Sequence, residues 1–215
     1  MSKKIAVILS GCGVYDGAEI HESVMAMLAI DKAGASYQCY APNIEQHHVI
    51  NHLTGDEMAE TRNVLVESAR IARGDIKKLS DLKTDDVDAL LLPGGFGAAK
   101  NLSSFAFDGT DCHINAEVAR TISAFHQAGK PIAALCISPV ILAKLIDGAT
   151  VTMGEDENCN GAVRAMGGDT KNTQHGQVVV DQDNKLVTAP CYMLESRISE
   201  IALDAEKAVE ALLAL

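Results

Sequence analysis

Short runs of apolar residues alternate with amphipathic stretches along the chain, and this alternation is typical of a parallel α/β sheet. The run KIAVILS at 4–10 is rich in β-branched residues and stops at glycines, which predicts a buried strand. Residues 20–34 place apolar side chains such as Val24 at helical spacing, and SYQCYAP at 36–42 predicts a second strand. A strand, a helix and a strand in this order indicate a parallel pair.

The rest of the chain continues this pattern after a polar middle segment. Residues 43–86 are polar and charged, and they predict an insertion with at least one helix. After it, the pattern predicts strands at 88–95, 131–136, 149–153, 177–181 and 185–190, and helices at 114–130, from Ser138 and at 198–215. The last two strands form a predicted hairpin. We therefore expect a single domain over 1–215, an α/β three-layer sandwich with a mostly parallel sheet and a small antiparallel extension.

The carboxyl ends of the strands are the expected place for a ligand in such a sheet. Three turns should meet there: the loop at 10–17, the Pro-Gly-Gly turn at 93–95 and the turn that holds Cys136. The sequence therefore predicts a candidate site around these turns.

Composition narrows the class of partner. The chain has 215 residues, of which 47% are hydrophobic and 22% charged, as in ordinary globular domains. Its net charge of −11 argues against nucleic acid, because that affinity rests mainly on Lys and Arg contacts to phosphate. The first apolar run, IAVIL, is too short for a signal peptide or a membrane span, so we expect a cytoplasmic protein without a membrane partner. A small neutral or cationic molecule and a homodimer are compatible with these totals.

The six cysteines are scattered and form no CxxC pair, so neither a zinc site nor a disulfide framework is predicted. Cys136 differs from the other cysteines in its position, because it ends the apolar run IAALC and is followed by a predicted helix. It is either a small core residue or a nucleophile held on a strand-to-helix turn in an unusual backbone conformation. In the second case, N–H groups at the helix start should lower the pKa of the thiol from about 8.5.

The glycine-rich loop after the first strand invites a nucleotide-binding interpretation, which the spacing argues against. Gly11, Gly13 and Gly17 do not form GxGxxG, and the second strand does not end in an acid that would bind a ribose. No dinucleotide or other cofactor is therefore predicted. The glycines instead allow a wide loop to approach a ligand.

Two acids at the start of the next helix are candidates for partnering the thiol. Glu19 and Glu22 are one turn apart and lie on the same side of the predicted helix. A carboxyl group beside a thiolate in a desolvated cleft tends to be protonated and to donate a hydrogen bond to the sulfur. The alternative is a pair of solvated acids that stabilise the helix start by a few tenths of a kcal/mol each.

Backbone amides in two turns are candidates for binding an oxyanion. Gly94 and Gly95 allow N–H groups to face inward, and with the amide of Ile137 they would form an oxyanion-binding pair. The alternative is a plain turn.

Histidines offer a weaker signal. His48 and His52 have the i, i+4 spacing of a metal chelate if their stretch is helical, but no third ligand is evident, so no metal site is predicted. We expect the insertion to help form the wall of the cleft, through His52 or Arg62. Three single histidines in polar surroundings are predicted to lie on the surface: His113, His126 and His175.

Several of these motifs together resemble a known group of proteins. VILSGCGVYDGAEIHE, LLPGGFGAAKNLSSFA and ALCISP, with VINHLTG and ETRNVLVESARIARG in the insertion, are similar to the ElbB-type proteins. These form the "enhancing lycopene biosynthesis", or sigma cross-reacting, branch of the DJ-1/PfpI superfamily. The resemblance covers nearly the whole chain and implies a class I glutamine-amidotransferase-like, flavodoxin-like fold.

The resemblance also implies a function and a set of site residues. It implies a nucleophile-elbow cysteine at Cys136, a carboxylic acid partner at Glu22 and an anion site formed by the amides of Gly95 and Ile137. The branch has glutathione-independent glyoxalase activity, which converts glyoxal to glycolate and can reflect protein deglycation. Its name links it to isoprenoid pathways without a defined reaction there, and a role in stress response is an alternative expectation.

One departure from related enzymes matters. Glutaminases and protease-like relatives place a histidine downstream of the cysteine, where this chain has VTMGEDENCNG. Glutamine hydrolysis and proteolysis are therefore not expected. Our leading hypothesis is a lyase-type glyoxalase that acts on small α-oxoaldehydes through a hemithioacetal at Cys136. The alternatives are a redox sensor whose oxidised Cys136 is held by Glu22, and a scaffold in isoprenoid metabolism that does not need the cysteine.

Overall fold

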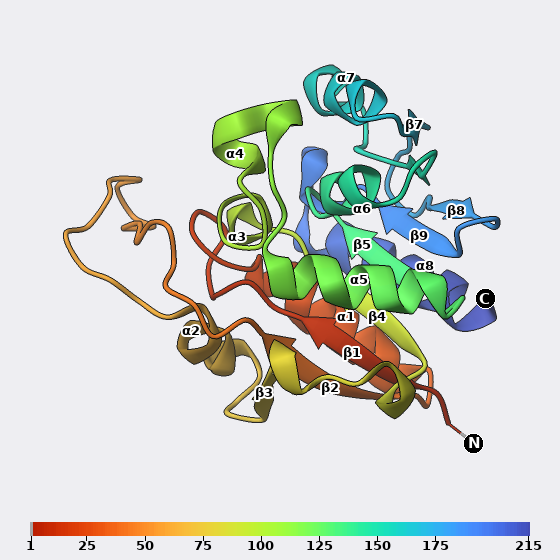
Figure 1. Ribbon diagram of the computed structural model, residues 1–215, viewed down its shortest axis with the longest axis horizontal. Helices are drawn as coiled ribbons and strands as arrows, with labels where there is room; N and C mark the ends of the chain where they lie inside the picture. The colour runs from red at the N-terminus through yellow and green to blue at the C-terminus, as the bar shows by residue number, and fades with distance from the viewer. Residues whose placement is uncertain (1) are drawn as a thin grey trace.

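A seven-stranded sheet with the order β3-β2-β1-β4-β5-β9-β8 forms the middle layer of the computed structural model, which describes residues 2–215 (Figure 1). The strands are β1 (Lys4–Ile8), β2 (Ser36–Ala41), β3 (Ile76–Lys78), β4 (Ala89–Leu92), β5 (Ile132–Leu135), β8 (Val179–Asp181) and β9 (Leu186–Ala189). Every neighbouring pair is parallel except β8–β9. The order β2-β1-β4-β5-β9 is the 2-1-3-4-5 order of flavodoxin-like sheets. The predicted mostly parallel sheet with a small antiparallel extension is confirmed.

Helices cover both faces of the sheet, and this explains why the strands are apolar throughout. One face packs against α1 (Ile20–Lys32) and α8 (Ile198–Ala214), and the other against α5 (Ala116–Gln127) and α6 (Pro139–Leu145). In β1, Ile5 and Val7 belong to the first core, while Ala6 and Ile8 belong to the second. Among the described residues, no helix is long and apolar enough to cross a membrane.

Several smaller elements complete the domain. They are α3 (Phe96–Lys100), α4 (Phe105–Asp108), α7 (Glu157–Ala165), the short 3-10 helix η4 (Cys191–Met193), and a separate two-stranded parallel sheet of β6 (Thr150–Val151) and β7 (Asp169–Thr170). The strand expected at 149–153 therefore belongs to this small sheet and not to the main one.

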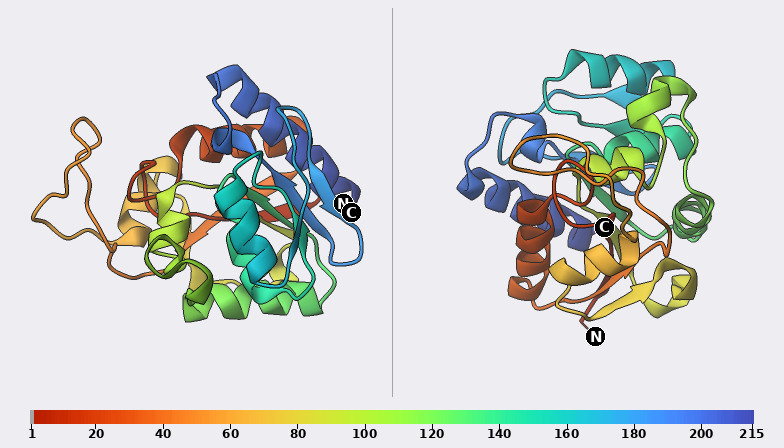
Figure 2. Two further views of the ribbon diagram at one scale, coloured as in Figure 1. Left: turned by 90° about the horizontal axis from the view of Figure 1, so that it is seen from above. Right: turned by 90° about the vertical axis from the view of Figure 1, so that its left-hand side faces the viewer.

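The segment 43–86 contains one α-helix, α2 (Val64–Ile71), two short 3-10 helices, η1 (Leu79–Asp81) and η2 (Thr84–Asp86), and one strand that the sequence did not predict. That strand is β3, whose sequence IKK is short and charged and forms only the edge of the sheet. Residues 43–63 form a long loop that projects from the body of the molecule (Figures 1 and 2). The helix that would have aligned His48 with His52 is absent, because the loop folds back on itself through a bridge between Ile50 and Glu57.

Helix α1 lies where predicted, but the side chains that it buries are unusual. Val24 and Leu28 are exposed, and the buried face carries Glu22 and Ser23 together with small and apolar residues. A fully buried acid in the first turn of a helix requires polar partners. Those partners identify the site.

Candidate active site

The turn after β5 lies beside the turns after β4 and β9. Leu92 of β4 is level with Ala134, and Leu135 is level with Ala189 of β9, so all three strands end together. Cys136 follows directly with φ of +57°, a backbone conformation that residues other than glycine rarely adopt. Its N–H donates to the carbonyl of Ala189 at 3.0 Å, which holds the strained turn against the neighbouring strand.

Glu22 is the acid that reaches the thiol. It is fully buried, and its carboxyl group forms a hydrogen bond with the thiol of Cys136. Its Oε2 accepts the N–H of Gly94 at 2.8 Å, and its Oε1 accepts the N–H of Tyr192 at 3.3 Å. Glu19 instead caps α1 by accepting the N–H of Glu22 at 2.7 Å. The two acids therefore divide their roles, one at the sulfur and one at the helix end.

The environment of Glu22 favours the neutral carboxyl group. Burial, with a further contribution from Glu19, raises the pKa of Glu22 to about 7, although the N–H groups of Gly94 and Tyr192 act in the opposite direction. A carboxyl group with this pKa exchanges its proton readily near neutral pH.

The thiol of Cys136 behaves differently from the prediction. Burial, followed by the charge of Glu22, raises the pKa of Cys136 well above its ordinary value. The amides of Gly95 and Ile137 do lower it, as expected, but burial of a side chain that is only 8% exposed outweighs them. The predicted lowered pKa is therefore wrong, and the thiol needs a base to become a nucleophile.

The three predicted amides have two different roles. The N–H groups of Gly95 and Ile137 both donate to the sulfur of Cys136, so they lie next to any oxygen on a carbon bonded to it. The N–H of Gly94 is committed to Glu22. Gly95 has φ of +93°, and a Cβ atom at this position would clash with the backbone of Gly17 and Glu19, so a larger residue does not fit there.

Gly94 leaves the space in which the thiol and the carboxyl group meet. A Cβ atom at this position would lie 2.7 Å from Glu22 Oε2 and 3.0 Å from Cys136 Sγ. We expect Gly94→Ala to separate the two groups and to lower the rate of iodoacetamide alkylation at Cys136, or of any turnover, by about tenfold or more, while overpacking costs about 1–3 kcal/mol of stability. Gly161→Ala in α7 is the matched control, because its Cβ meets nothing within 4 Å. Equal reactivity in both variants would contradict this account.

A cavity of about 340 Å³ opens beside the sulfur. It is lined by Cys136, Gly95, Ile137 and Glu19, together with Val14, Phe96, Ala99, Phe105, Ala106, Asp156, Cys159, Tyr192 and Met193. The lining residues other than Cys136, Gly95, Ile137 and Glu19 were not predicted from the sequence as part of the site. Tyr192 and Met193 follow β9, so the rule that places ligands at carboxyl ends of strands would have found them if β9 had been placed next to β5.

None of the residues that line this cavity comes from 43–86, within the part of the chain that the structure describes. The predicted contribution of His52 and Arg62 to its wall is therefore wrong. His52 packs over Gly13, and its Nε2 accepts the N–H of Tyr15 at 3.2 Å, so it supports the glycine loop from outside. Arg62 pairs with Glu60 at 2.8 Å, because the projecting loop keeps both on its own surface.

The position where related enzymes have a histidine is acidic here, as the sequence indicated. Asp156 lines the cavity and caps α7 by accepting the N–H of Cys159 at 2.8 Å. His175, which was predicted to lie on the surface, is instead largely buried and pairs with Asp204 at 2.8 Å. That prediction is wrong because a distant helix supplies a partner that local sequence does not reveal.

Comparisons with known proteins find relatives that match most of the chain. The chain is 47% identical over 208 residues to Glutamine amidotransferase-like class 1 domain-containing protein 3, mitochondrial, of Homo sapiens, covering 92% of this chain and 78% of that protein. It is 36% identical over 209 residues to ES1 protein, mitochondrial, of Danio rerio, covering 89% and 77%. Those names place the relatives in mitochondria, whereas the sequence led us to expect a cytoplasmic protein.

A solved structure extends the likeness to the whole fold. An isoprenoid biosynthesis protein with an amidotransferase-like domain from Ehrlichia chaffeensis superimposes with a TM-score of 0.91 at 35% identity, covering 98% of this chain and 99% of that one. The predicted class I glutamine-amidotransferase-like fold is confirmed. The model of the DJ-1/PfpI family matches residues 14–193, a range that includes the thiol, the acid and both amides, and the chain belongs to the DJ-1/PfpI family.

Proposed function

We propose that the protein is a glutathione-independent glyoxalase that converts α-oxoaldehydes to hydroxy acids. The observation that carries the proposal is the pairing of Cys136 with Glu22, a buried acid with a pKa of about 7, beside a cavity. Such an acid can act as base and then as acid in one cycle, so no histidine is needed. The resemblance of the motifs to ElbB-type proteins supports the same activity, including deglycation of proteins that carry the aldehyde.

The first half of the cycle forms a carbon–sulfur bond. The Glu22 carboxylate takes the thiol proton while the Cys136 sulfur attacks the aldehyde carbon, and the carbonyl electron pair becomes an alkoxide. The amides of Gly95 and Ile137 stabilise this oxyanion. Return of the proton from the carboxyl group gives a neutral hemithioacetal and restores the carboxylate.

The second half moves a hydrogen between neighbouring carbons. Glu22 removes the proton on the hemithioacetal carbon, which gives an enediol, and returns a proton to the adjacent carbon. The product is a thioester of the hydroxy acid with Cys136. Water then cleaves the carbon–sulfur bond, releases the hydroxy acid and regenerates the thiol, so no oxidant or reductant is consumed.

The cavity wall indicates which aldehydes fit best. Phe96, Phe105 and Ile137 are apolar, and the two charged groups in the wall, Glu19 and Asp156, are acidic. An apolar substituent gains free energy by leaving water, while an anionic one would meet two carboxylates. We therefore assign the substrate class as neutral α-oxoaldehydes, including those with an apolar group larger than hydrogen.

We expect the protein to form glycolate from glyoxal without glutathione, and to use phenylglyoxal with kcat/KM higher by about tenfold. Its matched anionic analogue, 4-carboxyphenylglyoxal, should be used less well than phenylglyoxal by a similar factor. Chromatography of the hydroxy acid products measures both. Asp156→Asn keeps the helix cap and should narrow the difference between the two aryl substrates. Absence of hydroxy acid from every aldehyde would refute the proposal.

Redox sensing and scaffolding remain the rival functions. A redox sensor needs an accessible thiol of low pKa, and burial gives Cys136 the opposite properties. Selective oxidation of Cys136 by mild peroxide in mass spectrometry, with no aldehyde turnover, would favour sensing. The isoprenoid role in the name of the Ehrlichia protein would favour a scaffold if Cys136→Ala kept the biological activity.

A further inference from the structure

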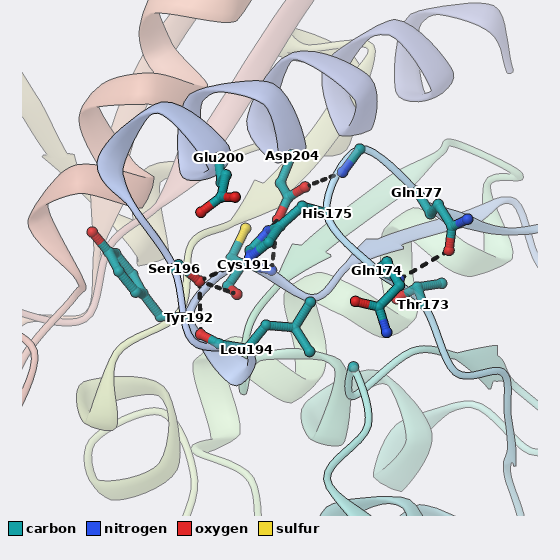
Figure 3. Close-up of polar contacts among 12 residues, drawn as sticks. Thr173, Gln174, His175, Gln177, Cys191, Tyr192, Leu194, Ser196, Glu200 and Asp204 are labelled. Atoms are coloured by element: carbon teal, nitrogen blue, oxygen red, sulfur yellow. Dashed lines mark hydrogen bonds and ion pairs between the residues drawn. The ribbon is translucent and has the colours of Figure 1, made fainter.

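A buried ion pair lies behind the turn that holds Tyr192. His175, in the loop between β7 and β8, is 16% exposed, and its Nδ1 lies 2.8 Å from Oδ2 of Asp204, which is fully buried on α8 (Figure 3). Asp204 also accepts the N–H of Gly176 at 2.6 Å and the N–H of Cys191 at 3.2 Å. The carboxylate therefore joins the His175 loop to the first residue of η4.

The second ring nitrogen of His175 faces oxygen atoms. Nε2 lies 3.2 Å from Oγ of Ser196 and 3.3 Å from the carbonyl oxygen of Glu195. The Ser196 hydroxyl donates its own proton to the carbonyl of Leu194 at 2.7 Å. Nε2 must then carry a hydrogen, since it otherwise faces two acceptors. With Nδ1–H donated to Asp204, both nitrogens are protonated and the ring is an imidazolium.

The charges around the ring favour this state. Burial is the largest single influence and lowers the pKa of His175, but the hydrogen bond to Asp204, the carbonyl of Glu195 and the charges of Asp204 and Glu200 together raise the pKa above its ordinary value. The groups that face the ring from α8 are Asp204 and Glu200, and those from the segment after η4 are Ser196 and the Glu195 carbonyl. All of them are acidic or neutral.

The same three side chains have the order of a Ser-His-Asp triad, but Ser196 is not placed as a nucleophile. Its hydroxyl lies between the carbonyl oxygens of Leu194 and Cys191, which would repel a developing oxyanion. Neither Ser196 nor His175 lines the cavity beside the thiol. The cluster is an anchor for the chain.

The anchored turn reaches the active site on its other side. Cys191 has φ of +45°, a strained conformation for a residue other than glycine, and Asp204 holds it through its N–H. The next residue, Tyr192, donates its N–H to Glu22 at 3.3 Å, and Tyr192 and Met193 form part of the cavity wall. Only one peptide unit separates the anchor from the catalytic acid.

We infer that His175 is a positioning residue for this site: as an imidazolium it fixes the turn at 191–196, and its deprotonation loosens the hold of that turn on Glu22 and on the cavity wall. The kinetic consequence rests on the proposed function, and the effect on Glu22 does not. Without the Tyr192 N–H the carboxylate is less stabilised, so the pKa of Glu22 should rise above about 7.

The test follows Glu22 directly. In protein labelled with carboxyl-13C glutamate, the Glu22 signal is identified by its loss in Glu22→Gln and titrated by NMR. We expect His175→Gln to raise the titration midpoint by roughly half a unit. Ser196→Ala should shift it in the same direction by less, and serves if His175→Gln folds poorly. His126→Gln, whose ring bonds Asn184 on the far side of the domain, should leave it unchanged.

Kinetics supply a second readout. The KM of the natural protein for phenylglyoxal should rise several-fold at alkaline pH, and His175→Gln should show the raised KM at all pH values. An unchanged Glu22 midpoint in both variants, or a KM that still rises with pH in His175→Gln, would overturn the inference. If no aldehyde is turned over, the proposed function fails, and the NMR titration still decides the role of His175.

Discussion

Cys136→Ala should lose at least about 10³-fold in kcat for glyoxal, because the variant has no atom that can form the hemithioacetal. The sulfur is the group to which the Gly95 and Ile137 amides donate and which contacts the Glu22 carboxyl. Removing it therefore removes both halves of the proposed cycle. Glycolate formed per minute, measured at saturating glyoxal, gives the ratio directly.

Two controls separate this loss from the general reactivity of thiols with aldehydes. Cys136→Ser keeps a hydrogen-bonding hydroxyl at the same turn and should be almost as inactive, since a serine hydroxyl is far less acidic than a thiol. Cys12→Ser removes a half-buried thiol from the loop after β1 and should keep full activity. Glycolate formation that survives in Cys136→Ala, or falls in Cys12→Ser, would exclude the mechanism.

Local hydrophobic patterns correctly predicted the central strands of the sheet, because an apolar run reflects the burial of a strand on both faces. IAVI at 5–8, ALLL and IAAL are apolar at every position, and all three strands lie in the sheet with both faces covered. The edge strand β3 was missed because its sequence IKK is held by one neighbour, β2, and carries no apolar pattern. The prediction that the projecting loop lines the cavity was wrong, because its sequence does not indicate in which direction the loop points from the body of the domain.

The site residues could be predicted only where the local sequence of a single turn indicates a strand end or a helix start. Cys136 and Gly95 were found from strand ends, and Glu22 from its place at the start of a helix. The raised pKa of the thiol could not be predicted, because it depends on how completely packing excludes water from the sulfur. The partnership of His175 with Asp204 joins residues 29 positions apart and is likewise a product of the tertiary structure.

Glu22→Gln should lower kcat/KM for glyoxal by about 10²–10⁴-fold, the contribution usual for a positioned acid–base group. A glutamine side chain cannot take the thiol proton or move a proton between the two carbons. The natural protein should also show the titration of this group. Glu22 must be ionised to act as base, and its pKa is about 7, so kcat/KM should rise tenfold per pH unit below that value. Above it, kcat/KM should reach a plateau that ends at alkaline pH, where deprotonation of His175 raises KM.

Because Glu19 lies beside Glu22 and affects its pKa, the pH dependence of kcat/KM is a sharper test of the role of Glu22 than the loss of activity alone. Glu19 is the second cause of the raised pKa of Glu22, after burial, and its Oε2 accepts the Glu22 N–H at 2.7 Å. Glu19→Gln keeps an oxygen for that cap and removes the charge, so the acid limb of kcat/KM should move to lower pH. In Glu22→Gln the limb should disappear and leave a flat profile. A limb near pH 7 that persists in Glu22→Gln would assign the base to another residue.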